Sequence, residues 1–191
     1  VPPGTLERRH DRFRVLSPYF LGTQEVSNAD FARYRATGAV PAPELPLSSD
    51  DLPICNVAEP DIYGYCDWAG LRAATQVEWE YAALDQVAWN DAGPPFDGPC
   101  PVGDRTIAGA RARFGHWHLA GNAAEFVQFL SLGDEQALPA RVPCALGGSY
   151  VHARGQDDLR ALFWGERRPD SGFRVARGVG AERGEFYKVG E

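Results

Sequence analysis

The sequence predicts an α+β fold in which short helices surround small twisted antiparallel sheets, with much irregular loop between them. Three observations favour this class. The helical patterns are short and start at capping residues, the strand-like runs are also short, and 21 glycines and 15 prolines are scattered along the chain. The 191 residues suit one domain with a substantial core. We expect a single domain over residues 1–191, with an irregular lead-in at 1–17 and a tail at 178–191.

Three helices are expected from their capping residues and apolar faces. Ser27 is a suitable N-cap for a first short helix, because its hydroxyl can accept a hydrogen bond from a free amide. Apolar residues spaced along one face predict a second helix over 61–69, and Gly70 suits its left-handed end. Thr75 and Glu78 have the spacing of a capping box, which predicts that a third helix begins there.

Short strands are expected around these helices. Residues 19–26 read YFLGTQEV, which indicates a strand before the first helix. Residues 147–150 and 172–176 read GGSY and GFRVA, and they suit the starts or ends of closing strands. The stretch 89–104 is dense in glycine and proline and is expected to be loop.

The charge balance excludes several classes of partner. The formal net charge is −7 and no basic stretch is longer than a triad, so nucleic acid is a poor partner. No apolar run approaches the roughly 18 residues that a membrane span needs, and no segment resembles a signal peptide. The location stays open between the cytoplasm and display at a surface through a preceding part of the protein.

The cysteine pattern indicates free thiols. The four cysteines are too few and too widely spaced for a disulfide scaffold. There is no CxxC pair, which also argues against a structural zinc site. We expect Cys55, Cys66, Cys100 and Cys144 to be small buried thiols.

Four sequence blocks carry a family resemblance. Residues 20–31 read FLGTQEVSNADF, residues 65–83 contain YCDWAGLR and TQVEWEYAA, and residues 119–127 read LAGNAAEFV. The fourth block is GGSY at 147–150, followed by GFR at 172–174. Their motifs and order resemble the formylglycine-generating-enzyme (sulfatase-modifying-factor) family. The resemblance implies a C-type-lectin-like fold over nearly the whole chain.

The same resemblance implies that the chain is not an oxidase. Oxidase members of the family use two cysteines after the GGSY-type block to hold copper and attack a substrate thiol. Counted from that block, these positions hold His152 and Asp157. We therefore expect no catalytic residues and no formylglycine-generating activity. One alternative is a metal-dependent oxidase or sulfoxide-synthase-like enzyme that uses His116, His118 or His152, and another is a sensor or adaptor domain of a larger protein such as a kinase.

No cofactor is expected, apart from one structural cation that the resemblance suggests. Some family members carry calcium near the Gly-Asn block, with oxygen ligands. The corresponding ligands here are the Glu125 carboxylate and the backbone at Gly121 and Ala123. His118 replaces the acidic or amide residue that the family has at the start of this site, which weakens the case for calcium.

The segment between the last two landmarks is the candidate binding surface. Ligands of C-type-lectin-like domains are commonly met there, and variable proteins of diversity-generating retroelements randomise side chains between similar landmarks. The segment is rich in Tyr, Trp and Arg, the residues that dominate binding hot spots. The expected partner is a protein or another macromolecule, and the alternative is that Phe163 and Trp164 pack inward. The candidate residues are Tyr150, Val151, His152, Arg154, Gln156, Asp158, Phe163, Trp164, Glu166, Arg167 and Arg168.

Overall fold

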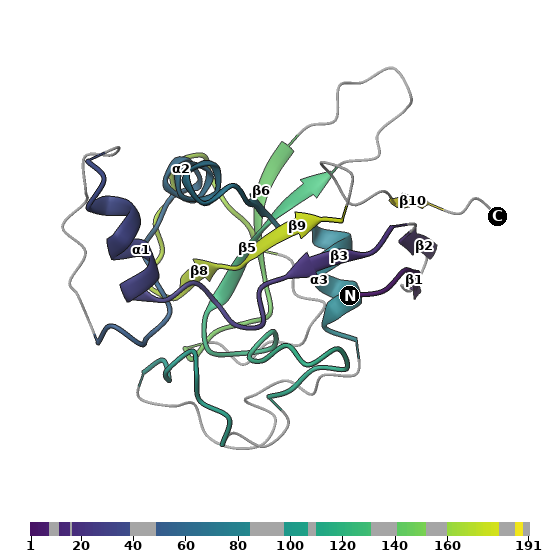
Figure 1. Ribbon diagram of the computed structural model, residues 1–191, viewed down its shortest axis with the longest axis horizontal. Coiled ribbons are helices and arrows are strands. Elements are labelled where there is room, and N and C mark those ends of the chain that lie inside the picture. Colours follow the sequence, from purple (N-terminus) through teal and green to yellow (C-terminus); the bar gives the residue numbers. More distant parts are fainter. Residues whose placement is uncertain are drawn as a thin grey trace.

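The computed structural model describes most of the chain, namely residues 1–7, 12–15, 17–38, 49–84, 98–106, 110–130, 141–151, 160–179 and 186–188. Within them it contains three helices, α1 (Asn28–Arg35), α2 (Glu59–Ala69) and α3 (Gln76–Ala82). Figure 1 shows α1 and α2 on one side of the crossing strands and α3 on the other. Among these described helices, none is long and apolar enough to cross a bilayer.

Three small sheets make up the β structure, as the sequence predicts. Their strand orders are β1-β2-β10, β3-β9-β4 and β7-β6-β5-β8. One pairing differs from the expected antiparallel pattern: β8 runs parallel to β5. The two strands are separated in the chain by β6 and β7. The strands are β1 (Gly4–Glu7), β2 (Arg12–Val15), β3 (Tyr19–Leu21), β4 (Arg72–Ala73), β5 (Ala124–Leu130), β6 (Arg141–Leu146), β7 (Arg160–Ala161), β8 (Ser171–Phe173), β9 (Val175–Gly178) and β10 (Phe186–Lys188).

The structure differs from two expectations, an irregular lead-in and a strand that reaches Val26, and it adds a strand in the tail. The lead-in at 1–17 contains the β1–β2 hairpin, and the tail at 178–191 supplies β10, which pairs with β2. Strand β3 ends at Leu21 and does not continue to Val26. Beyond Leu21 the regular pairing stops, and the Thr23 carbonyl accepts a hydrogen bond from the Trp117 amide at 2.8 Å.

The helix ends confirm the capping predictions. The Ser27 hydroxyl accepts a hydrogen bond from the Asp30 amide at 3.1 Å, and the Thr75 hydroxyl accepts one from the Glu78 amide at 3.3 Å. Gly70 closes α2 in the left-handed region with φ of 66°. Helix α2 begins two residues earlier than expected, because the Asp61 carboxylate accepts a hydrogen bond from the Ala58 amide and stabilises the preceding turn.

Two apolar clusters hold these elements together. One joins α3 to the sheets around Trp79, which has no exposed surface. The other lies beneath α1 and α2, where the ring of Tyr65 meets Phe31 and Phe173 at centroid distances of 5.7 and 5.4 Å. Phe173 is the last residue of β8, so the second cluster fixes the strand that follows the candidate binding segment.

Candidate functional site

A closed β-turn stands at the centre of the candidate binding segment. The Glu166 amide donates to the Phe163 carbonyl at 2.9 Å, and the Glu166 carboxylate accepts from the Phe163 amide at 2.9 Å. Gly165 has φ of +76°, the left-handed geometry that the third residue of a type II turn requires. We call residues 163–166 the aromatic turn. Its geometry is fixed by backbone and side chain together.

The aromatic turn presents two large rings to solvent. Phe163 is 82% exposed and Trp164 is 72% exposed, so they do not pack inward. Val151, at the other end of the described binding segment, is also exposed. Side chains of this size are usually at least partly covered, which makes two adjacent exposed rings a candidate contact surface.

The two arginines after the turn have structural partners. Arg167 Nη1 lies 2.6 Å from the Asp61 carboxylate, and the same nitrogen donates to the Asn56 carbonyl. Arg168 lies 3.2 Å from Glu166 and 3.4 Å from Asp170. Ligand contact by these arginines stays a prediction, and the structure shows both in ion pairs that attach the turn to its surroundings.

Asp170 joins the two described ends of the binding segment. One of its carboxylate oxygens pairs with Arg168, and the other accepts a hydrogen bond from the Ser149 hydroxyl at 3.0 Å. Tyr150 is half-buried, and its backbone amide donates to the Asn122 carbonyl. Burial raises the pKa of the Tyr150 phenol. The sequence missed Asp61 and Asp170 as anchors, because their partners are set by the tertiary fold. His152, Arg154, Gln156, Asp157 and Asp158 lie outside the described residues.

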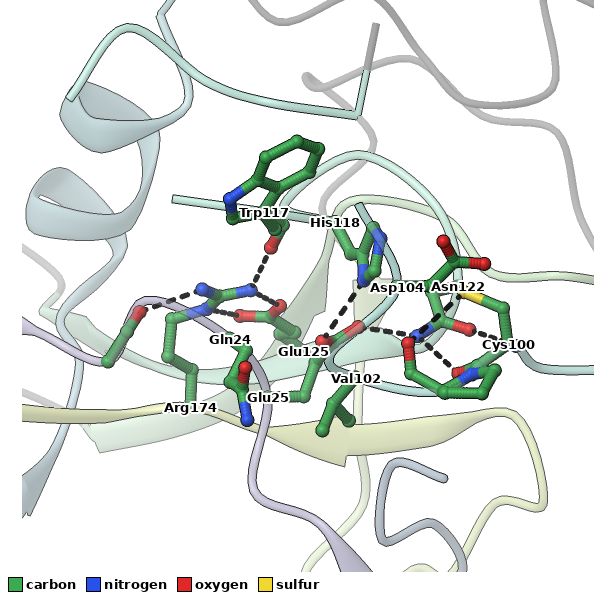
Figure 2. Close-up of polar contacts among 12 residues, drawn as sticks. Gln24, Glu25, Cys100, Val102, Asp104, Trp117, His118, Asn122, Glu125 and Arg174 are labelled. Atoms are coloured by element: carbon green, nitrogen blue, oxygen red, sulfur yellow. Dashed lines mark hydrogen bonds and ion pairs between the residues drawn. The ribbon is translucent and has the colours of Figure 1, made fainter. Parts of the chain in front are cut away.

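Figure 2 shows a buried ionic centre around Arg174 and Glu125. The Arg174 guanidinium binds both oxygens of Glu125, at 2.7 and 2.9 Å, and the Trp79 indole donates to Glu125 at 2.7 Å. Arg174 also donates to the carbonyls of Gly22 and Trp117. Burial raises the pKa of Glu125, and the Arg174 guanidinium opposes that rise.

These contacts do not fit the calcium prediction. Both oxygens of Glu125 already serve Arg174 or Trp79, so a calcium ion would have to compete with a buried guanidinium. The Gly121 amide donates to the Gly147 carbonyl, and Ala123 is fully buried. Across the described residues, no cluster of three or more His, Cys, Asp or Glu side chains is arranged to hold a metal.

A second buried polar group adjoins the ionic centre and was not predicted. The Asn122 amide donates to Glu25 at 2.8 Å and its oxygen accepts from the Cys100 backbone at 2.9 Å. His118 Nδ1 lies 3.6 Å from Glu25, as Figure 2 shows. The sequence did contain a signal for this group, since Glu25 and Asn122 are polar residues within the blocks at 20–31 and 119–127. The contacts connect those blocks and identify a structural role for them.

Burial keeps the thiols of Cys55 and Cys100 and the imidazole of His116 uncharged at neutral pH. Burial raises the pKa of Cys55 and Cys100 to about 12, so both thiols are protonated at neutral pH. Burial, with a smaller contribution from the Arg174 charge, lowers the pKa of His116 to about 4. A neutral imidazole and protonated thiols of this kind are typical of packed side chains.

Comparisons with known proteins agree with the motifs and the fold. The family model described as a sulfatase-modifying factor enzyme 1-like domain matches residues 1–93. The bovine (Bos taurus) protein named inactive C-alpha-formylglycine-generating enzyme 2 is 27% identical over 165 residues, which cover 71% of this chain and 54% of that protein. The chain is thus similar to the formylglycine-generating enzymes. The formylglycine-generating enzyme of Mycobacterium tuberculosis is 45% identical over 47 residues, which cover 22% of this chain and 16% of that protein. The chain therefore spans about half or less of the length of these relatives.

Solved structures establish the fold at low sequence identity. PvdO from Pseudomonas aeruginosa superposes with a TM-score of 0.66 and 16% identity, covering 94% of this chain and 99% of that one. Treponema denticola variable protein 1 superposes with a TM-score of 0.59 and 15% identity, covering 91% of this chain and 98% of that one. CarF superposes with a TM-score of 0.62 and 16% identity, covering 86% of this chain and 87% of that one. These likenesses confirm the C-type-lectin-like fold of the formylglycine-generating-enzyme type.

Proposed function

We propose that this chain is a non-catalytic ligand-binding domain that engages a protein or another macromolecule through the segment from Tyr150 to Arg168. The observation that carries the proposal is the aromatic turn, which holds Phe163 and Trp164 exposed on a closed backbone. Each ring can bury on the order of 150–250 Å² on contact with a partner. The segment thus has the composition and the exposure of a binding hot spot.

The anchoring of the turn supports binding for an energetic reason. Association is weakened by the entropy lost when loops and side chains become ordered at the interface. Here Glu166 closes the turn and Arg167 attaches it to Asp61, so less order has to be created on binding. A rigid turn with two exposed rings is therefore better prepared for a partner than a loop of the same composition.

The lack of catalysis is proposed from the sequence and the chemistry of the described thiols. His152 and Asp157 stand where the oxidases have their cysteines. The bovine relative carries the word inactive in its name, and the fold is shared with a variable protein, both of which fit a domain that binds without turnover. Diversification of residues 150–168 between gene copies would extend the proposal to a retroelement-type variable protein. A near-copy of these codons beside a reverse transcriptase would establish that extension, and its absence would remove it.

A peptide selection tests the binding proposal. A phage library of random peptides is selected on the immobilised wild-type chain, and the affinities of enriched peptides are measured by fluorescence anisotropy. We expect the double variant Phe163→Ala/Trp164→Ala to weaken them by about ten-fold or more. Phe20→Ala is the matched control, because Phe20 is a 63% exposed ring on another surface. Enriched peptides that bind the double variant as well as wild type would contradict the proposal.

A separate assay tests the absence of oxidase activity. The purified chain is supplied with copper and incubated in air with a cysteine-containing peptide, and the peptide is followed by mass spectrometry. We expect no formylglycine to form above the level seen without the chain, because the positions of the two family cysteines hold His152 and Asp157. Conversion of the cysteine to formylglycine at a rate proportional to enzyme concentration would overturn the proposal.

A further inference from the structure

Residues 56–61 hold the aromatic turn from a distant part of the sequence, and we call them the clasp. The Asn56 amide donates to the Arg168 carbonyl at 2.8 Å, and the Asn56 carbonyl accepts from Nη1 of Arg167 at 3.1 Å. The same nitrogen lies 2.6 Å from Oδ2 of Asp61. These contacts join the clasp to the two residues that directly follow the turn.

One oxygen of Asp61 serves both the clasp and the turn. Oδ2 accepts a hydrogen bond from the Ala58 amide at 2.8 Å, which stabilises the first turn of α2, and it also pairs with Arg167. The side chain of Asp61 is 7% exposed and that of Arg167 is 34% exposed. Water screens a pair at this depth less than a pair on the open surface, so the start of α2 is firmly connected to the turn.

The backbone of the clasp is strained at Asn56. Its φ is +60°, in the left-handed region that residues other than glycine adopt at an energetic cost and asparagine adopts more readily than most. Strain of this kind persists where surrounding contacts hold it, and it is frequent at binding sites. The bonds from Asn56 to Arg167 and Arg168 are contacts of this kind. The strained backbone and the attachment of the turn therefore depend on each other.

From these contacts we infer that Asp61 is a positioning residue of the binding surface, which acts on a partner through Arg167 and is itself too buried to touch it. A closed clasp holds the rings of Phe163 and Trp164 in one orientation, whereas an open clasp leaves the turn with fewer attachments. A partner binds the closed form, so its apparent affinity falls with the fraction of molecules that are closed. This inference rests on the proposed binding function and adds a means of regulating it from α2.

The first test needs no partner. Asp61→Asn removes the charge that pairs with Arg167 and keeps a side-chain oxygen for the α2 start. We expect hydrogen exchange of the Glu166 amide, which closes the aromatic turn, to accelerate about five-fold. Asp30→Asn is the matched control, because Asp30 also lies in the first turn of a helix and pairs with an arginine, Arg33 of the same helix. Unchanged exchange in Asp61→Asn, or equal acceleration in the control, would overturn the inference.

The second test measures the peptides selected on the wild-type chain. Asp61→Asn should weaken their binding about five-fold, chiefly through slower association, because fewer molecules present the closed turn. Arg167→Gln should weaken it at least as much. Arg167→Lys should weaken it less, since a single nitrogen makes both contacts with the clasp and a lysine ammonium can supply them.

A double-variant cycle separates positioning from direct contact by Arg167. The variant Asp61→Asn/Arg167→Gln should bind the peptides no more weakly than Arg167→Gln alone, because Asp61 has then lost the residue through which it acts. An arginine that only contacts the partner would be released by Asp61→Asn, and binding would stay unchanged or become tighter. That result, or losses that add in the double variant, would overturn the inference.

The outcomes distinguish this inference from the proposed function. Peptides that depend on Trp164 but bind Asp61→Asn as tightly as wild type leave the binding function standing and overturn the role of Asp61. Failure to select any peptide that depends on Trp164, together with faster Glu166 exchange in Asp61→Asn alone, contradicts the binding function and leaves the coupling of Asp61 to the turn standing.

Discussion

Arg174 and Glu125 form a two-point ion pair in which neither side chain is exposed. The nitrogens Nη2 and Nε of Arg174 lie 2.7 and 2.9 Å from the two oxygens of Glu125. Arg174 directly follows β8, and Glu125 belongs to the neighbouring strand β5. The pair therefore joins the third and fourth sequence blocks at the point where the candidate binding segment returns to the core.

The first prediction concerns the loss of this pair. Arg174→Met should lower the free energy of unfolding by about 3–5 kcal/mol, because it leaves the Glu125 carboxylate buried without its cation. Urea denaturation followed by fluorescence measures the change. Arg177→Met is the control, since Arg177 is exposed on β9. Equal stability of the two variants would show that the ion pair is not a stabilising contact.

The second prediction compares two buried serines near the binding segment. Ser171→Ala should leave the free energy of unfolding unchanged or raise it, because the removed hydroxyl has no hydrogen-bond partner among the described residues. Ser149→Ala should lower it by about 1–2 kcal/mol, because that hydroxyl donates to Asp170 and accepts from the Val151 amide. Thermal and urea unfolding distinguish the two. A comparable loss in both variants would mean that the Ser171 hydroxyl is bonded in solution.

Local chemistry made the helices predictable from the sequence. The hydroxyls of Ser27 and Thr75 and the left-handed Gly70 act on amides and carbonyls within a few residues, so their signal is contained in a short window. The hairpin in the lead-in was not predictable in this way. Strands β1 and β2 are four residues each, and β2 is also paired with β10 at the other end of the chain.

The candidate site was predictable in position but not in orientation. The landmarks GGSY and GFR fixed where the segment lies, and the resemblance suggested what it does. Whether Phe163 and Trp164 point inward or outward depends on the turn at Gly165 and on the ion pair between Arg167 and Asp61. Arg167 and Asp61 are more than 100 residues apart in the sequence. Arg167 and its other partner, Asn56, are separated by 111 residues. The calcium prediction failed to fit for a similar reason, because the distant Arg174 occupies the carboxylate.

The third prediction concerns the backbone of the aromatic turn. Gly165→Ala should destabilise the turn by about 1 kcal/mol, because a side chain at φ of +76° is strained even though no neighbour lies within reach. Hydrogen exchange of the Glu166 amide, which closes the turn, should accelerate about five-fold. Gly98→Ala is the matched control, since Gly98 also faces open space without a positive φ. Unchanged exchange at Glu166 would show that the turn does not need the left-handed residue.

The fourth prediction uses the buried imidazole of His116. Its pKa is lowered to about 4 in the folded chain from an ordinary value of 6.5, chiefly by burial. The unfolded chain therefore binds more protons between these values, and the contribution of His116 to stability is complete above pH 6.5 and is lost as the pH falls toward 4. Between about pH 7.5 and about pH 4.5 the wild-type chain should lose about 2 kcal/mol more than the variant His116→Gln.

The measurement is urea unfolding of both proteins at both pH values. Taking the difference between the two proteins cancels the contribution of every titrating group that they share. The variant should be the less pH-sensitive of the two, because it carries no group at position 116 that the unfolded state can protonate. Parallel losses in the two proteins would mean that His116 keeps an ordinary pKa in the folded chain, which would require water to reach the imidazole beside Arg174.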